Sequence, residues 1–460
     1  MFTPEKAARL RRFLGGLPQP TATRLAKAIE ADRLTGGHGL PHELILDALR
    51  PALRVQAGRI PTPFRLFCRP FEDLLVDTRP KEKQKGRISR TSIIAVWRWL
   101  SETLISDETQ LFTADVKQLV SQGRELEALA RAGGYWTLAS SRMRDAIASN
   151  PSAARVALGS ETAVADAQEM ALLLSAGREV LAIQELLPKL TPQLGDTALR
   201  GLRDIYDGLI ATMPDAAPYV AVVAMHRLLH PWEALKLPQL ITNQTQDTLI
   251  SGTDMGLVGE VLFSDIERHG NAVRATRHPN FDTNELVDHL ARFTELSSHI
   301  VREIEVRRGG TWGKRLLADR AAVGETMEGL MERAEKDILD AMPLQRSGSY
   351  AGGPLVADLS HPVDEQKAER ARRYSALLAG SRHYAALGSF AAAFQRTMDA
   401  VSQHLRSYNE DLIREIRRAQ VSGAPRGLDR QFELAVELTA LIFSLEEAEH
   451  LQRRARAAQA

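Results

Sequence analysis

The chain has 460 residues, enough for two or three domains of ordinary size. Hydrophobic residues make up 44% and charged residues 25%, values that exclude disorder along the whole chain. Lys and Arg number 59 against 58 for Asp and Glu, so the net charge of +1 excludes a global field that would attract nucleic acid or an anionic membrane. Binding to nucleic acid or to an anionic membrane would need a local patch of basic residues.

Apolar residues recur every three to four positions along most of the sequence, which indicates amphipathic helices. The low aromatic content of 5% fits helix-on-helix packing through small and γ-branched side chains. We therefore predict an all-α fold, an irregular multi-helix array or bundle with a C-terminal antiparallel helical hairpin. Repeats of roughly 34 or 40 residues are not evident, which argues against a regular solenoid.

The single cysteine, Cys68, excludes an intramolecular disulfide and a cysteine-based zinc site, and it fits a reducing compartment. The N-terminal stretch lacks the apolar core of a secretory signal. No uncharged apolar run reaches the roughly 18–20 residues of a membrane span. These features predict a cytoplasmic protein without a membrane span, and the excess of Arg over Lys is typical of a protein from a GC-rich bacterial genome.

The first predicted region, 1–150, contains short helices punctuated by prolines and a distinctive segment at 58–90. Aromatic and leucine side chains in this segment follow helical spacing, but Pro70 would break or kink a helix through them. We expect these residues to pack as an aromatic plug: Phe64, Phe67, Phe71 and Leu74.

The second half of that segment is rich in basic residues and is expected to be an exposed loop. Basic groups close to Trp97 and Trp99 are a pattern that can bind phosphates and stack bases, although Asp77 and Glu82 dilute the charge and a solvated loop is the favoured explanation of the run. Nucleic acid and an acidic protein partner are the alternatives. The candidate anion-binding or nucleic-acid-binding residues are Arg79, Lys81, Lys83, Lys85, Arg87 and Arg90.

The sequence predicts helices through the rest of region 1–150 and through a central helical domain at 151–342. Within region 1–150, the helix predicted at 108–131 is expected to end near Gly133-Gly134. The predicted ranges are 93–105, 108–131, 160–187, 196–213, 215–230, 283–308 and 313–341.

His226 and His230 are spaced i, i+4, which would put both rings on one face of the helix predicted at 215–230 and suit a shared metal ion. A third ligand cannot be placed from the sequence. Two hydrogen-bonded histidines on a packed helix are the competing interpretation.

The helix predicted at 283–308 carries carboxylates and histidines that would share a face at i, i+4 spacing, as a metal site or as simple ion pairs. Its candidate metal ligands are Glu285, Asp288, His289, Glu295 and His299. A di-iron bundle would need two Glu-x-x-His pairs, and only one, Glu447 with His450, is found.

The turn RRGGTWGKR places Lys314 and Arg315 at the start of a helix. It departs from a phosphate-binding loop, because Arg308 and Arg315 stand where that pattern needs Gly and Ser or Thr. What remains is a candidate anion site at the helix start, aided by Lys314 and Arg315.

Residues 343–363 are rich in Gly, Ser and Pro and are predicted to be a linker or long loop. The region beyond, 364–460, is predicted to form a helical hairpin of helices at 364–420 and 428–457. Apolar residues in the first helix repeat at heptad spacing, which lets two helices pack lengthwise. The members of this heptad seam are Met398, Val401, Leu405, Tyr408 and Leu412.

Our leading hypothesis is a non-enzymatic protein-protein interaction protein, a scaffold or regulatory adaptor, whose partner is another protein or a second copy held by the heptad seam. One alternative is a helical-bundle metalloenzyme with a carboxylate/histidine site. A second alternative is nucleic-acid binding through residues 79–90. No catalytic residue is assigned, and no motif implies a specific cofactor.

Overall fold

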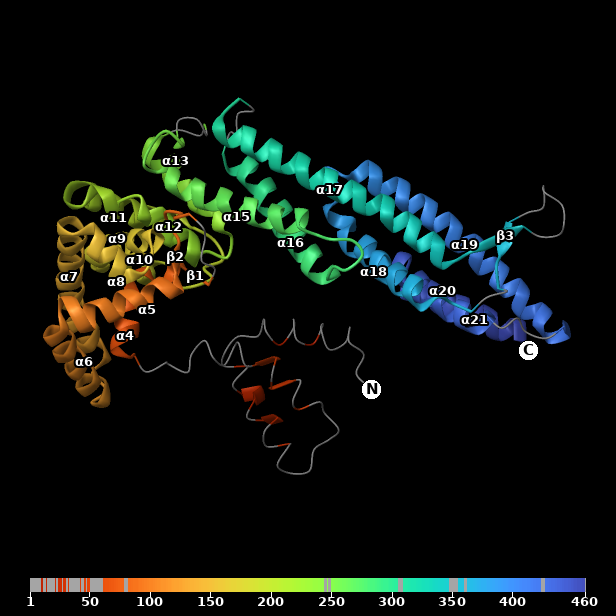
Figure 1. The fold of residues 1–460 in the computed structure, drawn as a ribbon, viewed down its shortest axis with the longest axis horizontal. Coiled ribbons are helices and arrows are strands. Elements are labelled where there is room, and N and C mark those ends of the chain that lie inside the picture. Colours follow the sequence, from red (N-terminus) through yellow and green to blue (C-terminus); the bar gives the residue numbers. More distant parts are fainter. Residues whose placement is uncertain are drawn as a thin grey trace. The chain divides into compact units, whose positions relative to one another are not determined.

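The structure, a computed structural model, confirms the predicted all-α fold (Figure 1). It describes residues 61–77, 82–243, 246, 250–304, 309–346, 355–359, 362–422 and 427–459, with scattered helical positions between residues 10 and 49. Strands are confined, within these residues, to two two-stranded sheets.

The chain divides into two compact units. Unit 1 comprises residues 1–69 and 97–142, and unit 2 comprises residues 70–96 and 143–460. The domain boundaries predicted from the sequence, at 150 and at 343–363, stay a prediction.

Unit 1 is built around aromatic side chains. Helix α4 (Pro63–Cys68) ends before Pro70, as the expected break requires, and Phe67 is fully buried. The Phe67 ring packs on Trp97 and Tyr135, with centroids 5.1 and 6.2 Å apart. Tyr135 also stacks on Phe112 of α6 (Ser106–Ser121). This part of the aromatic plug is confirmed.

The helix break expected at Gly133-Gly134 is wrong. Helix α7 (Glu125–Ser149) runs through both glycines, and the preceding helix, α6, ends near Gly123, which adopts a left-handed φ of 72°. Tyr135 and Trp136 directly after the glycine pair are buried. Tertiary packing of these side chains outweighs the low helix propensity of the two glycines.

The first part of unit 2 is a group of short helices with a small parallel sheet. The sheet pairs Leu75 with Ile88 and Val76 with Ser89. The elements are β1 (Leu75–Val76), β2 (Ile88–Ser89), α5 (Arg90–Trp99, which continues into unit 1), α8 (Pro151–Leu158), α9 (Glu161–Ser175), α10 (Gly177–Leu186), α11 (Asp196–Thr212), α12 (Tyr219–Arg227) and α13 (Lys236–Thr242).

Two predicted helices of this part are shorter than expected. The helix predicted at 160–187 is interrupted at Ala176, which leaves helical geometry with ψ at 22° just before Gly177. The helix predicted to reach His230 ends at Arg227, because Leu228 is extended and forms a parallel bridge with Thr191.

Long helices form the rest of unit 2: α15 (Gly256–Arg274), α16 (Thr283–Glu303), α17 (Thr311–Ala341), α18 (Glu365–Ser381), α19 (Ala391–Ser422), α20 (Leu428–Ile442) and α21 (Leu445–Gln459). In Figure 1, α17 and α19 lie side by side along much of their length. Between α17 and α18, the stretch predicted as a linker contains the antiparallel strands β3 (Leu344–Arg346) and β4 (Leu355–Ala357).

The antiparallel pair expected at the C-terminus is present as α19 and α20, but the two long helices predicted at 364–420 and 428–457 are wrong. The first range contains α18 and α19, and the second contains α20 and α21, which are separated at Phe443 and Ser444. Helix α20 runs antiparallel to α19, since Arg406 contacts Phe443 while Asn409 contacts Thr439.

The heptad seam of α19 packs inside the chain. Val401, Leu405, Tyr408 and Leu412 are all at most 1% exposed. These four side chains are therefore covered by neighbouring helices of the same chain, and the seam stabilises the fold of one copy.

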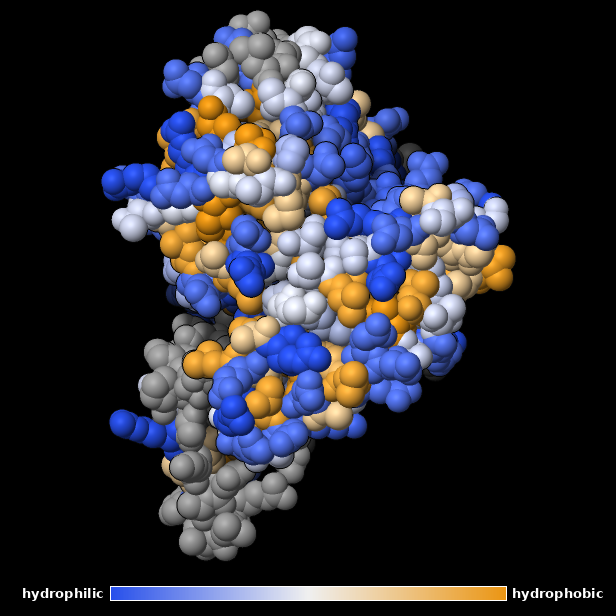
Figure 2. All heavy atoms as spheres, turned by 90° about the vertical axis from the view of Figure 1, so that its left-hand side faces the viewer, coloured by the Kyte–Doolittle hydropathy of each residue, from blue (hydrophilic) through white to orange (hydrophobic). Residues whose placement is uncertain are grey.

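Apolar side chains are also found on the surface. On the face shown in Figure 2 they form several separate groups divided by charged residues. Among the described helices, none is both long and apolar enough to cross a membrane.

Candidate functional site

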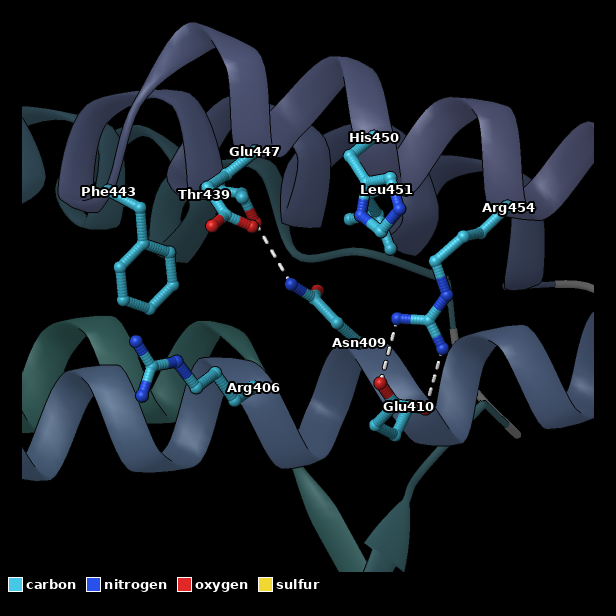
Figure 3. A pocket seen from close by; sticks show the side chains of 9 residues that line it. All are labelled: Arg406, Asn409, Glu410, Thr439, Phe443, Glu447, His450, Leu451 and Arg454. Atoms are coloured by element: carbon cyan, nitrogen blue, oxygen red, sulfur yellow. Dashed lines mark hydrogen bonds and ion pairs between the residues drawn. The ribbon is translucent and has the colours of Figure 1, made fainter.

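A cavity of about 280 Å³ opens between α19, α20 and α21 (Figure 3). Its volume is many times the roughly 30 Å³ that one water occupies and lies near the lower end of ligand-pocket sizes. Its walls are formed by Arg406, Asn409, Glu410, Thr439, Phe443, Glu447, His450, Leu451 and Arg454.

The cavity depends on the break between α20 and α21. Ser444 begins α21, because its Oγ accepts a hydrogen bond from the backbone N–H of Glu447 at 3.2 Å. Ser at this position followed by Glu three residues later is the capping-box pattern of a helix start. The chain therefore turns at Phe443, and α21 packs against both α19 and α20.

The floor of the cavity is formed by buried side chains, of which Asn409 is the most polar. Asn409 is 8% exposed, and its Nδ2 donates to Thr439 Oγ1 at 3.0 Å. Its Oδ1 is buried and has no hydrogen-bond partner among the described residues. Figure 3 shows the amide between α19 and the α20–α21 pair, in the middle of the cavity.

The orientation of this amide follows from the hydrogen bonds of Thr439. The Thr439 hydroxyl donates its one hydrogen to the carbonyl oxygen of Ala435 at 2.6 Å, so toward Asn409 it can only accept. The nitrogen of the amide must face Thr439. Oδ1 is consequently the atom left as an unused acceptor.

Two arginines of the cavity are held by neighbours. Arg454 binds both carboxylate oxygens of Glu410 at 2.8 Å, and this hydrogen bonding lowers the pKa of Glu410. Arg406 lies over the ring of Phe443, with its guanidinium carbon 4.9 Å from the centroid. Both arginines are thereby kept at the edges of the cavity.

Glu447 and His450 are exposed on α21, one turn apart, on the cavity side of the helix (Figure 3). No described cation lies within ion-pair distance of Glu447. The cavity thus combines a buried neutral acceptor, an exposed carboxylate and an imidazole, a set suited to binding a hydrogen-bond donor.

No protein family, curated protein or solved structure matches this chain. Any functional assignment therefore depends on the geometry of the chain's own residues.

The histidine pair predicted on one helical face is separated by the end of α12. His226 lies in the helix, while His230 lies beyond the extended Leu228. The Nε2 of His226 is buried without a hydrogen-bond partner among the described residues, and burial, followed by repulsion from Arg87, lowers its pKa to about 4. The expectation of a shared face is wrong because the helix ends three residues early.

The predicted ligands on α16 are dispersed around that helix. His289 contacts His269 of α15, with their Nδ1 atoms 2.9 Å apart, and lies 3.9 Å from Glu285. Trp232 stacks on both His299 and His230, with centroids 4.0 and 4.9 Å away.

The remaining two ligands predicted on α16 lie apart from these rings. Glu295 pairs with Arg292 at 3.2 Å, and Asp288 is exposed. Across the described part of the chain, no three His, Cys, Asp or Glu side chains are grouped to hold a metal. The metal hypothesis stays a prediction.

The basic loop is more internal than expected. Lys83 is wrongly predicted to be exposed: its Nζ lies 2.6 Å from Asp166 and also binds Glu169. Arg87 pairs with Asp265 at 2.6 Å, and the exposed Arg90 pairs with Asp77 at 2.7 Å.

Three of the six basic candidates thus bind carboxylates of the same chain. Lys85 is exposed, whereas Arg79 and Lys81 lie outside the described residues. Nucleic-acid binding by this loop stays a prediction.

Lys314 and Arg315 differ in what they contact. Arg315 binds Glu260 at 2.6 Å and Glu267 at 2.7 Å, while Lys314 is exposed at the start of α17. The candidate anion site therefore keeps Lys314 as its exposed cation.

The residues that line the cavity were largely missed at the level of sequence. Glu447 and His450 were noted as a single Glu-x-x-His pair, but Asn409 and Thr439 carry no motif. The one available signal was Ser444 with Glu447, a capping box inside a segment predicted as one helix. It would have indicated the break that opens the cavity.

Proposed function

We propose that this chain is a cytoplasmic, non-enzymatic adaptor that binds another protein through the α19–α21 cavity. The observation that carries the proposal is the buried Oδ1 of Asn409, which has no hydrogen-bond partner among the described residues. Leaving a buried acceptor unpaired costs about 1–3 kcal/mol. A partner that supplies a donor would recover that cost on binding.

The form of the cavity favours a protein over a drug-like small molecule. Small-molecule sites are concave and mostly apolar and bury most of the ligand. Here the rim is charged and open, with Arg406, Glu410, Glu447 and His450 all exposed. A single side chain of a partner, inserted as an anchor and surrounded by polar contacts, matches this arrangement.

Site-specific photo-crosslinking tests the proposal. A photoreactive phenylalanine analogue replaces His450 in the full chain, expressed in its native cells. The matched control carries the same analogue at Gln452, exposed on the same helix but turned away from the cavity. We expect a discrete protein adduct from position 450, absent from position 452 and lost when Asn409→Leu is added.

Absence of a protein adduct at position 450 would contradict the adaptor function. Adducts of equal yield at both positions, or an adduct that persists in the Asn409→Leu background, would contradict it as well.

A further inference from the structure

We infer that the α19–α21 cavity binds a protonated amine, the group found at the end of a lysine side chain or in a free polyamine. This inference rests on the proposed function and adds the chemistry of the bound group. It starts from Asn409, whose Oδ1 is fixed as the unused atom of the amide by the two hydrogen bonds of Thr439. A carbonyl oxygen only accepts, so the bound group must donate.

A carboxylate without an ion pair, together with Oδ1, favours a cationic donor. Glu410 and Arg454 neutralise each other through two hydrogen bonds of 2.8 Å. Glu447 also lines the cavity and has no ion pair with a described residue, and Figure 3 shows it near Thr439, with Asn409 reaching toward them from α19. A carboxylate and a carbonyl oxygen together favour an ammonium group, which carries three donors and a positive charge.

Arg406 allows the sign of the ligand's charge to be tested within the same cavity. Its guanidinium lies over Phe443, and the ion pairs of the described residues do not include it. A cationic ligand would be repelled by Arg406 and attracted by Glu447, whereas an anionic ligand would show the reverse. The two neutralising substitutions must therefore act in opposite directions.

The cavity also offers an apolar surface for the alkyl part of the ligand. Leu451 is 4% exposed and lines the cavity together with the ring of Phe443. An alkyl chain that leads to the amine can contact these side chains while its charged end reaches Asn409 and Glu447.

Titration calorimetry with the full chain tests the inference, with Nα-acetyl-lysine methylamide and spermidine as probes. The uncharged Nα,Nε-diacetyl-lysine methylamide is the control ligand. We expect the amines to bind and the acetylated form not to bind. Asn409→Leu and Glu447→Gln should each weaken binding roughly tenfold or more, and Arg406→Gln should strengthen it.

The matched control variant is Glu446→Gln, which removes the same charge from an exposed neighbour that does not line the cavity. It should leave amine affinity unchanged. Asn409→Leu should keep or raise the thermal midpoint, because it removes an unpaired buried acceptor while Thr439 keeps its bond to Ala435. Loss of binding in a folded variant then reports on the site itself.

The outcomes separate the inference from the proposed function. Failure of both amines to bind, or weaker binding in Arg406→Gln, would overturn the amine site even where crosslinks to a protein are found. Spermidine binding without any protein adduct would keep the amine site and overturn the adaptor function. Preference for the lysine probe over spermidine would assign the amine to a partner's side chain.

Discussion

At the scale of single residues, Lys83 and Asn409 are both largely buried, but Lys83 has a partner for each of its ammonium hydrogens, whereas Asn409 keeps an unpaired acceptor. Its three ammonium hydrogens reach Asp166 at 2.6 Å, Glu169, and the backbone oxygen of Arg87 at 2.5 Å. The side chains of the two carboxylates are 6% and 4% exposed. This cluster fixes the segment before β2 onto α9.

Replacing Lys83 with Met should therefore destabilise the fold by about 3–5 kcal/mol, because two buried carboxylates lose their cation. Glu169 would still accept hydrogen bonds from the Tyr219 hydroxyl and the Gly86 N–H, but these donors are neutral and do not replace the lost positive charge. Urea unfolding of the variant measures the loss. Lys85→Met, at an exposed position two residues away, is the control and should change stability by less than about 0.5 kcal/mol. Equal effects of the two substitutions would show that the cluster does not stabilise the fold.

At the scale of helices and strands, local periodicity predicted most helices but not where they break. The range predicted as 196–213 is α11 almost residue for residue, because its amphipathic pattern and the flanking Pro214 agree. The breaks at Ala176 and Leu228 depend on tertiary contacts, such as the bridge from Leu228 to Thr191. The candidate site could not be predicted for the same reason, since the orientation that leaves the buried Asn409 Oδ1 unpaired depends on a threonine thirty residues away on another helix.

The break between α20 and α21 leads to a prediction about the Ser444 cap. Ser444→Ala removes the acceptor of the Glu447 N–H and should destabilise the fold by about 1 kcal/mol. Because the cap also sets the position of Glu447, amine affinity should fall together with stability. Ser407→Ala, exposed in the interior of α19, is the control and should be neutral or slightly stabilising. A fully stable Ser444→Ala variant would mean that packing alone fixes the break.

At the scale of the whole molecule, two histidines that are largely or partly buried couple the fold to pH. Burial lowers the pKa of both His226 and His269 to about 4, against about 6.5 in an unfolded chain. Between these values the unfolded chain binds more protons than the folded one. Stability is therefore complete above about pH 6.5 and falls as the pH is lowered toward 4, with His226 contributing up to about 1.4 kcal/mol per pH unit.

Urea midpoints measured between about pH 5 and 6.5 test this coupling above the range in which most carboxylates titrate. His226→Leu should flatten the pH dependence, because an apolar side chain on buried α12 has no proton to gain. Measurement of the same variant at about pH 8 is the control, since His226 is neutral there in both folded and unfolded chains and only the packing change remains. If His226→Leu loses stability with falling pH as steeply as the unaltered chain, the acid sensitivity arises from other residues.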